Sequence, residues 1–329
     1  MNTLHLVIAF LISFAVSFAL YKIFIPLLRK VKLGQKILEI GPNWHKCKEG
    51  TPVMGGLFFI TGMAVSIGVM AILGDINAGN SFFVINICFA LMNACIGFID
   101  DYVKLFKKRN QGLTAIQKLI LQTASAAAYL FALSRCSLIT TVVNIPFSSS
   151  TVDLGFFYYI IIGVLIVYIV NTANLTDGLD GLAGSVAFVL AAMFLFVACK
   201  VSLGNLAFVE TALIGSLAAF LIFNFHPAKI FMGDTGSLFL GSMLVCCSMR
   251  VGRPLIMILA GLVYVFEGLS VMIQVAVFKA TKGKKRFFKM APIHHHFELC
   301  GLTEVKIVAM FLAFTVVIAA LSYFIIIKL

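Results

Sequence analysis

Residues 156–184 read FFYYIIIGVLIVYIVNTANLTDGLDGLAG, an apolar run that passes directly into a polar, glycine-rich segment. A helix needs roughly 17–25 apolar residues to cross the hydrocarbon core of a bilayer, and residues 156–173 meet that requirement. The segment that follows spaces Asn171, Asn174, Asp177 and Asp180 three residues apart, which on helical geometry makes one polar stripe. We therefore predict a membrane-spanning helix whose end carries a site for a polar ligand or a metal.

Other parts of the chain repeat this apolar pattern. The complete set of predicted spans is 3–25, 52–73, 80–99, 116–135, 156–173, 181–199, 206–224, 234–250, 254–278 and 306–327. Hydrophobic residues make up 61% of the chain and charged residues 12%, whereas about a quarter of an average soluble domain is charged. We predict an all-α polytopic membrane protein of about ten transmembrane helices, forming a single domain over residues 1–329. A soluble enzyme, a secreted disulfide scaffold and a disordered protein are excluded.

The basic residues, which leave a formal net charge of +12, are distributed unevenly along the chain. An even number of spans places both termini on one side, and five connections lie on the other: about 26–51, 100–115, 174–180, 225–233 and 279–305. Twenty of the 25 Lys and Arg residues lie at or beside these connections. The positive-inside rule predicts that the five connections are cytoplasmic and both termini extracytoplasmic. The excess of basic over acidic residues is therefore a signal of membrane topology and not a nucleic-acid-binding surface.

Two connections carry further features. On the outer side, residues 136–154 alternate β-branched and polar residues around Pro146, which predicts a short β-hairpin. On the cytoplasmic side, KGKKRFFKM (282–290) mixes basic and aromatic residues. That composition is typical of a stretch on the membrane surface, and equally of the positive-inside signal alone.

The acidic residues gather on the predicted cytoplasmic side, where nine of the thirteen lie in or beside the loops. In GFIDDYVK (97–104), the adjacent Asp100 and Asp101 repel each other, so they need a cation, a basic neighbour such as Lys104, or a shared proton. In NFHPAKIFMGDTGS (224–237), Asp234 opens a predicted helix. Exposed backbone N–H groups there suit a phosphate, and the carboxylate suits a Mg²⁺ that bridges phosphate oxygens.

Two further features surround this predicted site. APIHHHFE (291–298) contains three consecutive histidines, which face different ways on a helix and suit hydrogen bonds to a polyanionic ligand better than one metal. Glu267, within the ninth span, is interpreted as a buried, hydrogen-bonded structural acid. Oxygen ligands favour a hard cation, no CxxC pair or Walker motif occurs, and the sequence therefore predicts Mg²⁺-dependent chemistry on an already activated phosphorylated substrate.

Five motifs, taken in order, resemble the polyprenyl-phosphate N-acetylhexosamine-1-phosphate transferases. They are GTPVMGG (50–56), GFIDDYVK, NLTDGLDGLAG (174–184), FMGDTGS (231–237) and APIHHHFE, and the resemblance extends over about residues 30–320. PIHHHFE is the more specific sign of the branch that acts on muramoyl pentapeptide. The resemblance implies transfer of phospho-MurNAc-pentapeptide from UDP-MurNAc-pentapeptide to undecaprenyl phosphate, with release of UMP and formation of the first lipid intermediate of peptidoglycan. It also implies Mg²⁺ dependence, a homodimer, and a multi-pass protein of the bacterial cell membrane with its active site on the cytoplasmic face.

The same resemblance implies roles for individual residues. Asp234 would bind Mg²⁺, and Asp100, with Asp101 beside it, would deprotonate the lipid phosphate. The substrate-binding residues would be Lys118 near the phosphates, Asn174, Asp177 and Asp180 beside the nucleoside and diphosphate, Asn224, Phe231 and Gln274 on the uridine side, with Phe231 as the stacking ring, Lys48 at the nucleotide, and His294, His295 and His296 near the diphosphate and sugar. One departure is Val53, where the family often has Thr, so a hydroxyl contact is lost there.

Two alternatives remain at this point. A sister transferase would use UDP-N-acetylglucosamine or a related sugar nucleotide, and PIHHHFE argues against it. A transporter or lipid flippase would place charges along a path near mid-membrane, where only Glu267 lies deep.

Overall fold

The computed structural model describes residues 2–30, 48, 50–106, 112–148 and 150–328. Its long helices are α1 (Thr3–Lys30), α2 (Gly56–Ile72), α3 (Ser81–Phe106), α4 (Ala115–Arg135), α5 (Phe157–Thr176), α6 (Leu182–Lys200), α7 (Gly204–Asn224), α8 (Gly233–Arg250), α10 (Leu262–Ala280) and α12 (Glu304–Lys328). Two short helices, α9 (Ile256–Ala260) and α11 (Ile293–Leu299), and the strands β1 (Val142–Asn144) and β2 (Thr151–Asp153) complete the described part. Within these residues, eight helices are long and apolar enough to cross a membrane, which confirms the prediction of an all-α polytopic membrane protein.

The predicted span 254–278 is not one helix. It is divided into α9 and α10 at Gly261, whose backbone angles of φ −85° and ψ 24° leave the helical region. A Cβ on Gly261 would lie 2.6 Å from the carbonyl oxygen of Met257 and 2.7 Å from Leu244 Cδ2, so only glycine fits there. The break is invisible to hydropathy because the residues on both sides of it are apolar.

Helix α8 is buried along almost its whole length and is packed against α2, α3 and α5. Its sequence GDTGSLFLGSMLVCCSMR is rich in small residues, which allow neighbouring backbones to approach closely in a membrane bundle. The hydroxyls of Ser242 and Ser248 donate to carbonyls one turn earlier, at 2.8 Å each, so they are satisfied inside the helix. The first turn of α8, which carries Asp234, is therefore enclosed by other helices.

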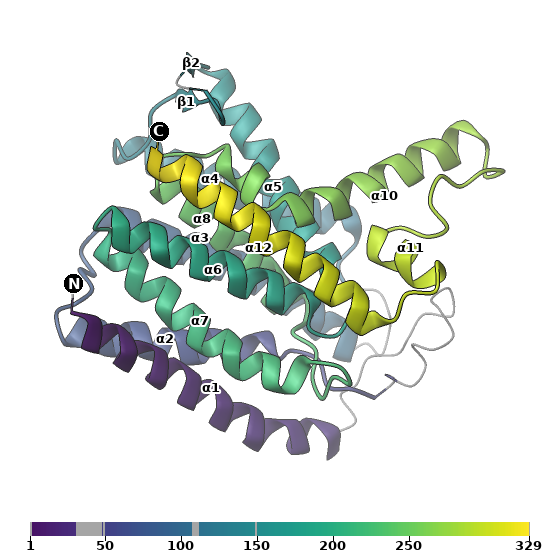
Figure 1. The fold of residues 1–329 in the computed structure, drawn as a ribbon, viewed down its shortest axis with the longest axis horizontal. Helices are drawn as coiled ribbons and strands as arrows, with labels where there is room; N and C mark the ends of the chain where they lie inside the picture. The colour runs from purple at the N-terminus through teal and green to yellow at the C-terminus, as the bar shows by residue number, and fades with distance from the viewer. Residues whose placement is uncertain (1, 31–47, 49, 107–111, 149, 329) are drawn as a thin grey trace.

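The two ends of the bundle differ. Both termini and the strands β1 and β2 lie at one end, whereas α11 lies at the other, and α10 extends away from the remaining helices (Figure 1). The strands are antiparallel, with Val143 opposite Val152, and this confirms the hairpin predicted within residues 136–154.

The crossing of α3 and α8 depends on Gly97, and we expect Gly97→Ala to destabilise the protein. The new Cβ would overlap the backbone of Asp234 and Thr235, and overpacking of this kind costs about 1–3 kcal/mol. Gly68→Ala, on α2, is the matched control because its Cβ would meet nothing within 4 Å. Thermal unfolding in detergent should show a lower midpoint for Gly97→Ala alone. Equal midpoints for the two variants would contradict the close crossing.

Candidate active site

Two carboxylates and two ammonium groups converge where α3, α4 and α8 meet. Lys104 Nζ lies 2.6 Å from Asp100 Oδ2 and 3.2 Å from Asp234 Oδ2. Lys118 Nζ lies 2.5 Å from Asp234 Oδ2 and 3.4 Å from Asp100 Oδ1. We call these four residues the acid–lysine cluster. The positive charge of Lys104, paired with Asp100, offsets the repulsion expected between Asp100 and Asp101.

Helix α5 binds the second oxygen of Asp234. Asn174 Nδ2 donates to Asp234 Oδ1 at 3.0 Å and to Ser237 Oγ at 2.7 Å. Ser237 in turn donates to the carbonyl of Gly233 at 3.1 Å, so it links Asn174 to the first turn of α8. The motif around Asp234 contains Ser237, but nothing in its sequence indicated this contact with Asn174.

Asp101 caps the N-terminus of α8. Its carboxylate accepts hydrogen bonds from the backbone N–H groups of Asp234 at 3.1 Å and Thr235 at 2.9 Å, and from Thr235 Oγ1 at 2.7 Å. Free N–H groups at a helix start favour a negative partner, and Asp101 supplies it. The prediction that exposed N–H groups there meet a phosphate is therefore wrong for Asp234 and Thr235. Asp101 instead fixes the backbone of Asp234, and thereby the position of the Asp234 side chain.

The predicted polar stripe of residues 171–180 is divided, because α5 ends at Thr176. Asn171 donates to Gln122 Oε1 on α4 at 2.5 Å, whereas Asn174 reaches the acid–lysine cluster. The prediction of one continuous helical stripe is therefore wrong.

Asp177, the residue after α5, is electrostatically coupled to acids on both sides. Burial, together with the charges of Asp234, Asp101 and Asp180, raises the pKa of Asp177 to about 8. Burial disfavours a carboxylate, and nearby negative charges add to that effect. A cation among these acids would favour the ionised form of Asp177.

Asp180 belongs to a second group, which we call the Asp180 cluster: Lys48, Asp180, His226 and Glu304. Lys48 Nζ lies 2.7 Å from Asp180 Oδ1 and 2.6 Å from Glu304 Oε1. Burial disfavours the charged Lys48, but the hydrogen bonds and charges of Asp180 and Glu304 raise its pKa above the usual value. His226 Nδ1 lies 3.2 Å from Asp180 Oδ2 and 3.3 Å from Glu304 Oε2. Neither His226 nor Glu304 is among the predicted site residues. His226 lies in the motif NFHPAKIFMGDTGS, where Asp234 carries the predicted metal role, and Glu304 lies outside every quoted motif.

Among the residues that the structure describes, two sets of oxygen or nitrogen ligands are close enough to hold a metal ion. Asp100, Asp101 and Asp234 form one set, and Asp180, His226 and Glu304 form the other, with ligand atoms in each set within 4.8 Å of one another. Only the first consists entirely of carboxylates, the ligands that Mg²⁺ prefers.

The residues predicted on the uridine side have protein partners. The Asn224 amide accepts from the Gly181 N–H at 3.0 Å and donates to the Ile230 carbonyl at 2.9 Å. Gln274 binds the backbone of 287–288 through three contacts of 2.9–3.1 Å and so joins that loop to α10. Phe231 is half-buried, and its backbone N–H donates to the Pro52 carbonyl at 2.9 Å.

The three histidines of α11 point in different directions, as consecutive helical residues should. His294 lies 3.0 Å from Glu267, and both are almost fully buried, which confirms the interpretation of Glu267 as a buried, hydrogen-bonded acid. His295 lies 2.7 Å from Glu298, and His296 Nδ1 accepts from the backbone N–H of Lys289 at 3.2 Å. The His294 ring packs against Gly178, and it therefore lies beside the loop that follows α5.

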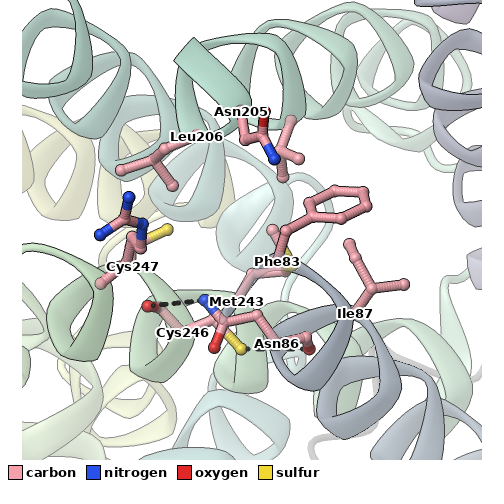
Figure 2. Close-up of a pocket in the computed structure, with 10 residues that line it drawn as sticks. Phe83, Asn86, Ile87, Asn205, Leu206, Met243, Cys246 and Cys247 are labelled. Atoms are coloured by element: carbon pink, nitrogen blue, oxygen red, sulfur yellow. Dashed lines mark hydrogen bonds between the residues drawn. The ribbon is translucent and has the colours of Figure 1, made fainter. Parts of the chain in front are cut away.

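A small cavity of about 30 Å³ lies elsewhere, between α3, α7 and α8 (Figure 2). Figure 2 shows Asn86 and Cys246 hydrogen-bonded across it, with Asn86 Nδ2 donating to the Cys246 carbonyl at 3.3 Å. Among the residues that the structure describes, its lining includes none of the predicted site residues. The acid–lysine cluster is therefore the stronger candidate for chemistry.

Comparison with known proteins identifies the family of this chain. The family model described as glycosyl transferase family 4 matches residues 83–252, which include Asp100, Lys118, Asn174 and Asp234. A phospho-N-acetylmuramoyl-pentapeptide-transferase of Clostridioides difficile is 43% identical over 95% of both chains. Proteins of the same name from Listeria welshimeri and Bacillus thuringiensis are 41% and 39% identical, over 98% and 95% of both chains respectively. The chain therefore belongs to the phospho-N-acetylmuramoyl-pentapeptide-transferase family, within glycosyl transferase family 4.

Proposed function

We propose that this protein transfers phospho-MurNAc-pentapeptide from its UDP carrier to undecaprenyl phosphate. UMP is released, and the lipid product is the first lipid intermediate of peptidoglycan synthesis. The observation that carries this proposal is the acid–lysine cluster, enclosed at one end of a membrane helix bundle in a chain 39–43% identical to transferases of that name. Such a cluster suits a reaction between two phosphate groups at a membrane.

The lysines address the main electrostatic obstacle. A lipid phosphate that approaches a sugar diphosphate is repelled by it, because both are anions. Lys104 and Lys118 converge on Asp234 from α3 and α4, so two ammonium groups are held in fixed positions, where they can donate to the reacting phosphates. Asp100 contacts both ammonium groups, and we assign its carboxylate as the base that accepts the remaining proton of the lipid phosphate.

The donor set fits Mg²⁺, which we propose as the cofactor. Asp234 would hold it, since Asp101 is already engaged by three hydrogen bonds from the start of α8 and Asp100 is assigned to the proton of the lipid phosphate. When bound, Mg²⁺ would neutralise charge on the phosphate oxygens and orient them. Asn174 would keep the Asp234 carboxylate turned toward the site through its 3.0 Å hydrogen bond.

The remaining substrate contacts are assigned by position. We propose that the nucleotide lies along the loop after α5 and the segment between α7 and α8, with the Phe231 ring stacked on uracil. The residues assigned to this part are Lys48, Asp177, Asp180, Asn224, Gln274, His294, His295 and His296. For Lys48, Asn224 and Gln274, the contacts with other protein groups described above support a role in shaping the pocket instead of a direct contact with the nucleotide.

The membrane arrangement is also proposed. The bundle crosses the bacterial cell membrane about ten times as a single domain, with the acid–lysine cluster on the cytoplasmic face. This assignment is supported by the count of basic residues in the connections and by the location of both termini at one end of the bundle (Figure 1). We propose a homodimer, by resemblance to the family.

Purified protein in detergent, with Mg²⁺ and undecaprenyl phosphate, provides the test. We expect UMP release with UDP-MurNAc-pentapeptide, and at least tenfold less with UDP-N-acetylglucosamine, because a missing substrate contact of about 1.4 kcal/mol already costs a factor of ten. Faster release from UDP-N-acetylglucosamine would assign the sister activity instead. No UMP release from either substrate would refute the proposed function. Full activity in the presence of EDTA would refute the proposed role of Mg²⁺.

A further inference from the structure

The Asp180 cluster joins four chain segments that lie far apart in the sequence. Glu304 Oε1, at the start of α12, accepts from the backbone N–H of Asp180 at 2.5 Å and from Lys48 Nζ at 2.6 Å. Asp180 Oδ2 also accepts from the backbone N–H of Ala228 at 2.9 Å. Glu304 therefore binds both the backbone of the loop after α5, at Asp180, and Lys48, which pairs with the Asp180 side chain.

The charges in this cluster do not favour a direct contact between Lys48 and a diphosphate. Two carboxylates surround one ammonium group, so the cluster is negative when His226 is neutral. The side chains of Asp180 and Glu304 are 1% and 10% exposed, and that of Lys48 is 13% exposed, so water screens these charges little. A diphosphate is an anion and would be repelled. In this arrangement Lys48 binds Asp180 and Glu304, in contrast to the direct nucleotide contact that the resemblance implied.

The loop that Glu304 binds leads directly to the acid–lysine cluster. Asp177 precedes Asp180 by three residues and directly follows the end of α5. Asn174 lies one turn earlier on α5 and donates to Asp234 at 3.0 Å. A shift of the Asp180 backbone would therefore be transmitted over a few residues to the groups that face Asp234.

We propose that Glu304 is a positioning residue. It holds the Asp180 N–H and Lys48 together and so keeps the end of α5, and with it Asn174, aligned with Asp234. Burying three charged groups costs free energy unless they are fully paired, so the cluster is a poor source of stability and a good determinant of geometry. The inference rests on the proposed function for its kinetic consequences, but not for its effect on cation binding.

Cation binding tests the proposal without any substrate. Full-length protein in nanodiscs would be titrated with Mn²⁺, a paramagnetic probe for a Mg²⁺ site, by electron paramagnetic resonance. Glu304→Gln keeps the size and an oxygen acceptor but loses the charge that binds Lys48. At the site that Asp234→Asn removes, we expect a 10–100-fold weaker affinity, the usual range for loss of an outer-sphere partner. A Mn²⁺ site that is lost in Glu304→Gln but kept in Asp234→Asn would mean that Glu304 binds the cation itself, and would overturn the proposal. Lys306→Gln, an exposed change on the same turn of α12, should leave the affinity within twofold of the wild type.

Kinetics provide the second arm. Glu304→Gln should lower kcat/KM for the UDP-linked substrate by about 10–100-fold and leave KM for undecaprenyl phosphate unchanged. Lys48→Met should cause a similar loss, and the double variant should lose little more than the larger single loss, because the two residues act through one contact. If the loss of kcat/KM in the double variant equalled the product of the two single losses, Lys48 and Glu304 would act independently, and the proposal would be overturned.

Two other results would also overturn it. One is an unchanged Mn²⁺ affinity in Glu304→Gln. The other is a higher nucleotide affinity in Glu304→Gln together with a lower one in Lys48→Met, which would mean that Lys48 binds the diphosphate and Glu304 only restrains it. A wild type that binds Mn²⁺ but releases no UMP would refute the proposed function, whereas the Mn²⁺ comparison would still decide the role of Glu304.

Discussion

Asp234→Asn is expected to reduce the kcat for UMP release by about 10³-fold, the loss of stabilisation typical of a central electrostatic group. Asn preserves the size of the side chain and its hydrogen bond from Asn174, but it removes the charge that Lys104 and Lys118 contact at 3.2 and 2.5 Å. The two lysines would then lose their orientation, and the proposed Mg²⁺ would lose a ligand. The measurement is a steady-state assay across a range of Mg²⁺ concentrations.

Asp75→Asn is the matched control for that assay. Asp75 lies in the connection between α2 and α3, where it pairs with His5 at 2.6 Å, and we expect normal activity from this variant. If Asp234→Asn kept activity within tenfold of the wild type, neither the metal role nor the electrostatic role of Asp234 would stand.

Asp101→Asn is expected to lower activity by about 10²-fold, because a displacement of about 1 Å at a reacting group can cost that much. The mechanism differs from that of Asp234. Asn retains one acceptor oxygen but directs an amide N–H₂ toward the donors of Asp234 and Thr235, so the cap on α8 is partly lost. Loss of such a cap also destabilises a helix by about 1 kcal/mol, and the thermal midpoint should fall together with activity.

Thr235→Val separates the contributions within this cap. It removes only the Oγ1 donor at 2.7 Å and leaves both backbone N–H groups on Asp101, so we expect a smaller loss of activity than in Asp101→Asn. An inactive Asp101→Asn with an unchanged thermal midpoint would contradict the positioning role and would place Asp101 among the metal ligands.

Particular residues show how far sequence reasoning reached into the site. The pairing of Asp100 with Lys104 follows from their i, i+4 spacing on one helix, and the structure has it at 2.6 Å. Lys118 was placed near the phosphates by resemblance alone, and the structure brings it to Asp234, 116 residues away in the chain. The role of Asp101 was not predictable, because adjacent aspartates look equivalent in sequence and differ only in what α8 presents to each.

The helical, multi-pass class of this protein was determined by its sequence alone. An apolar run long enough for a bilayer is a local property, and so are a motif such as GFIDDYVK and the alternation that predicts the β1–β2 hairpin. Tertiary structure alone decided which polar groups meet. Glu304 binds Asp180 across 124 residues and Lys48 across 256. At Gly261, where an apolar segment is divided into α9 and α10, the Leu244 side chain leaves no room for a Cβ. Hydrogen bonds and close packing depend on distances between segments remote in the chain, and local composition carries no record of those distances.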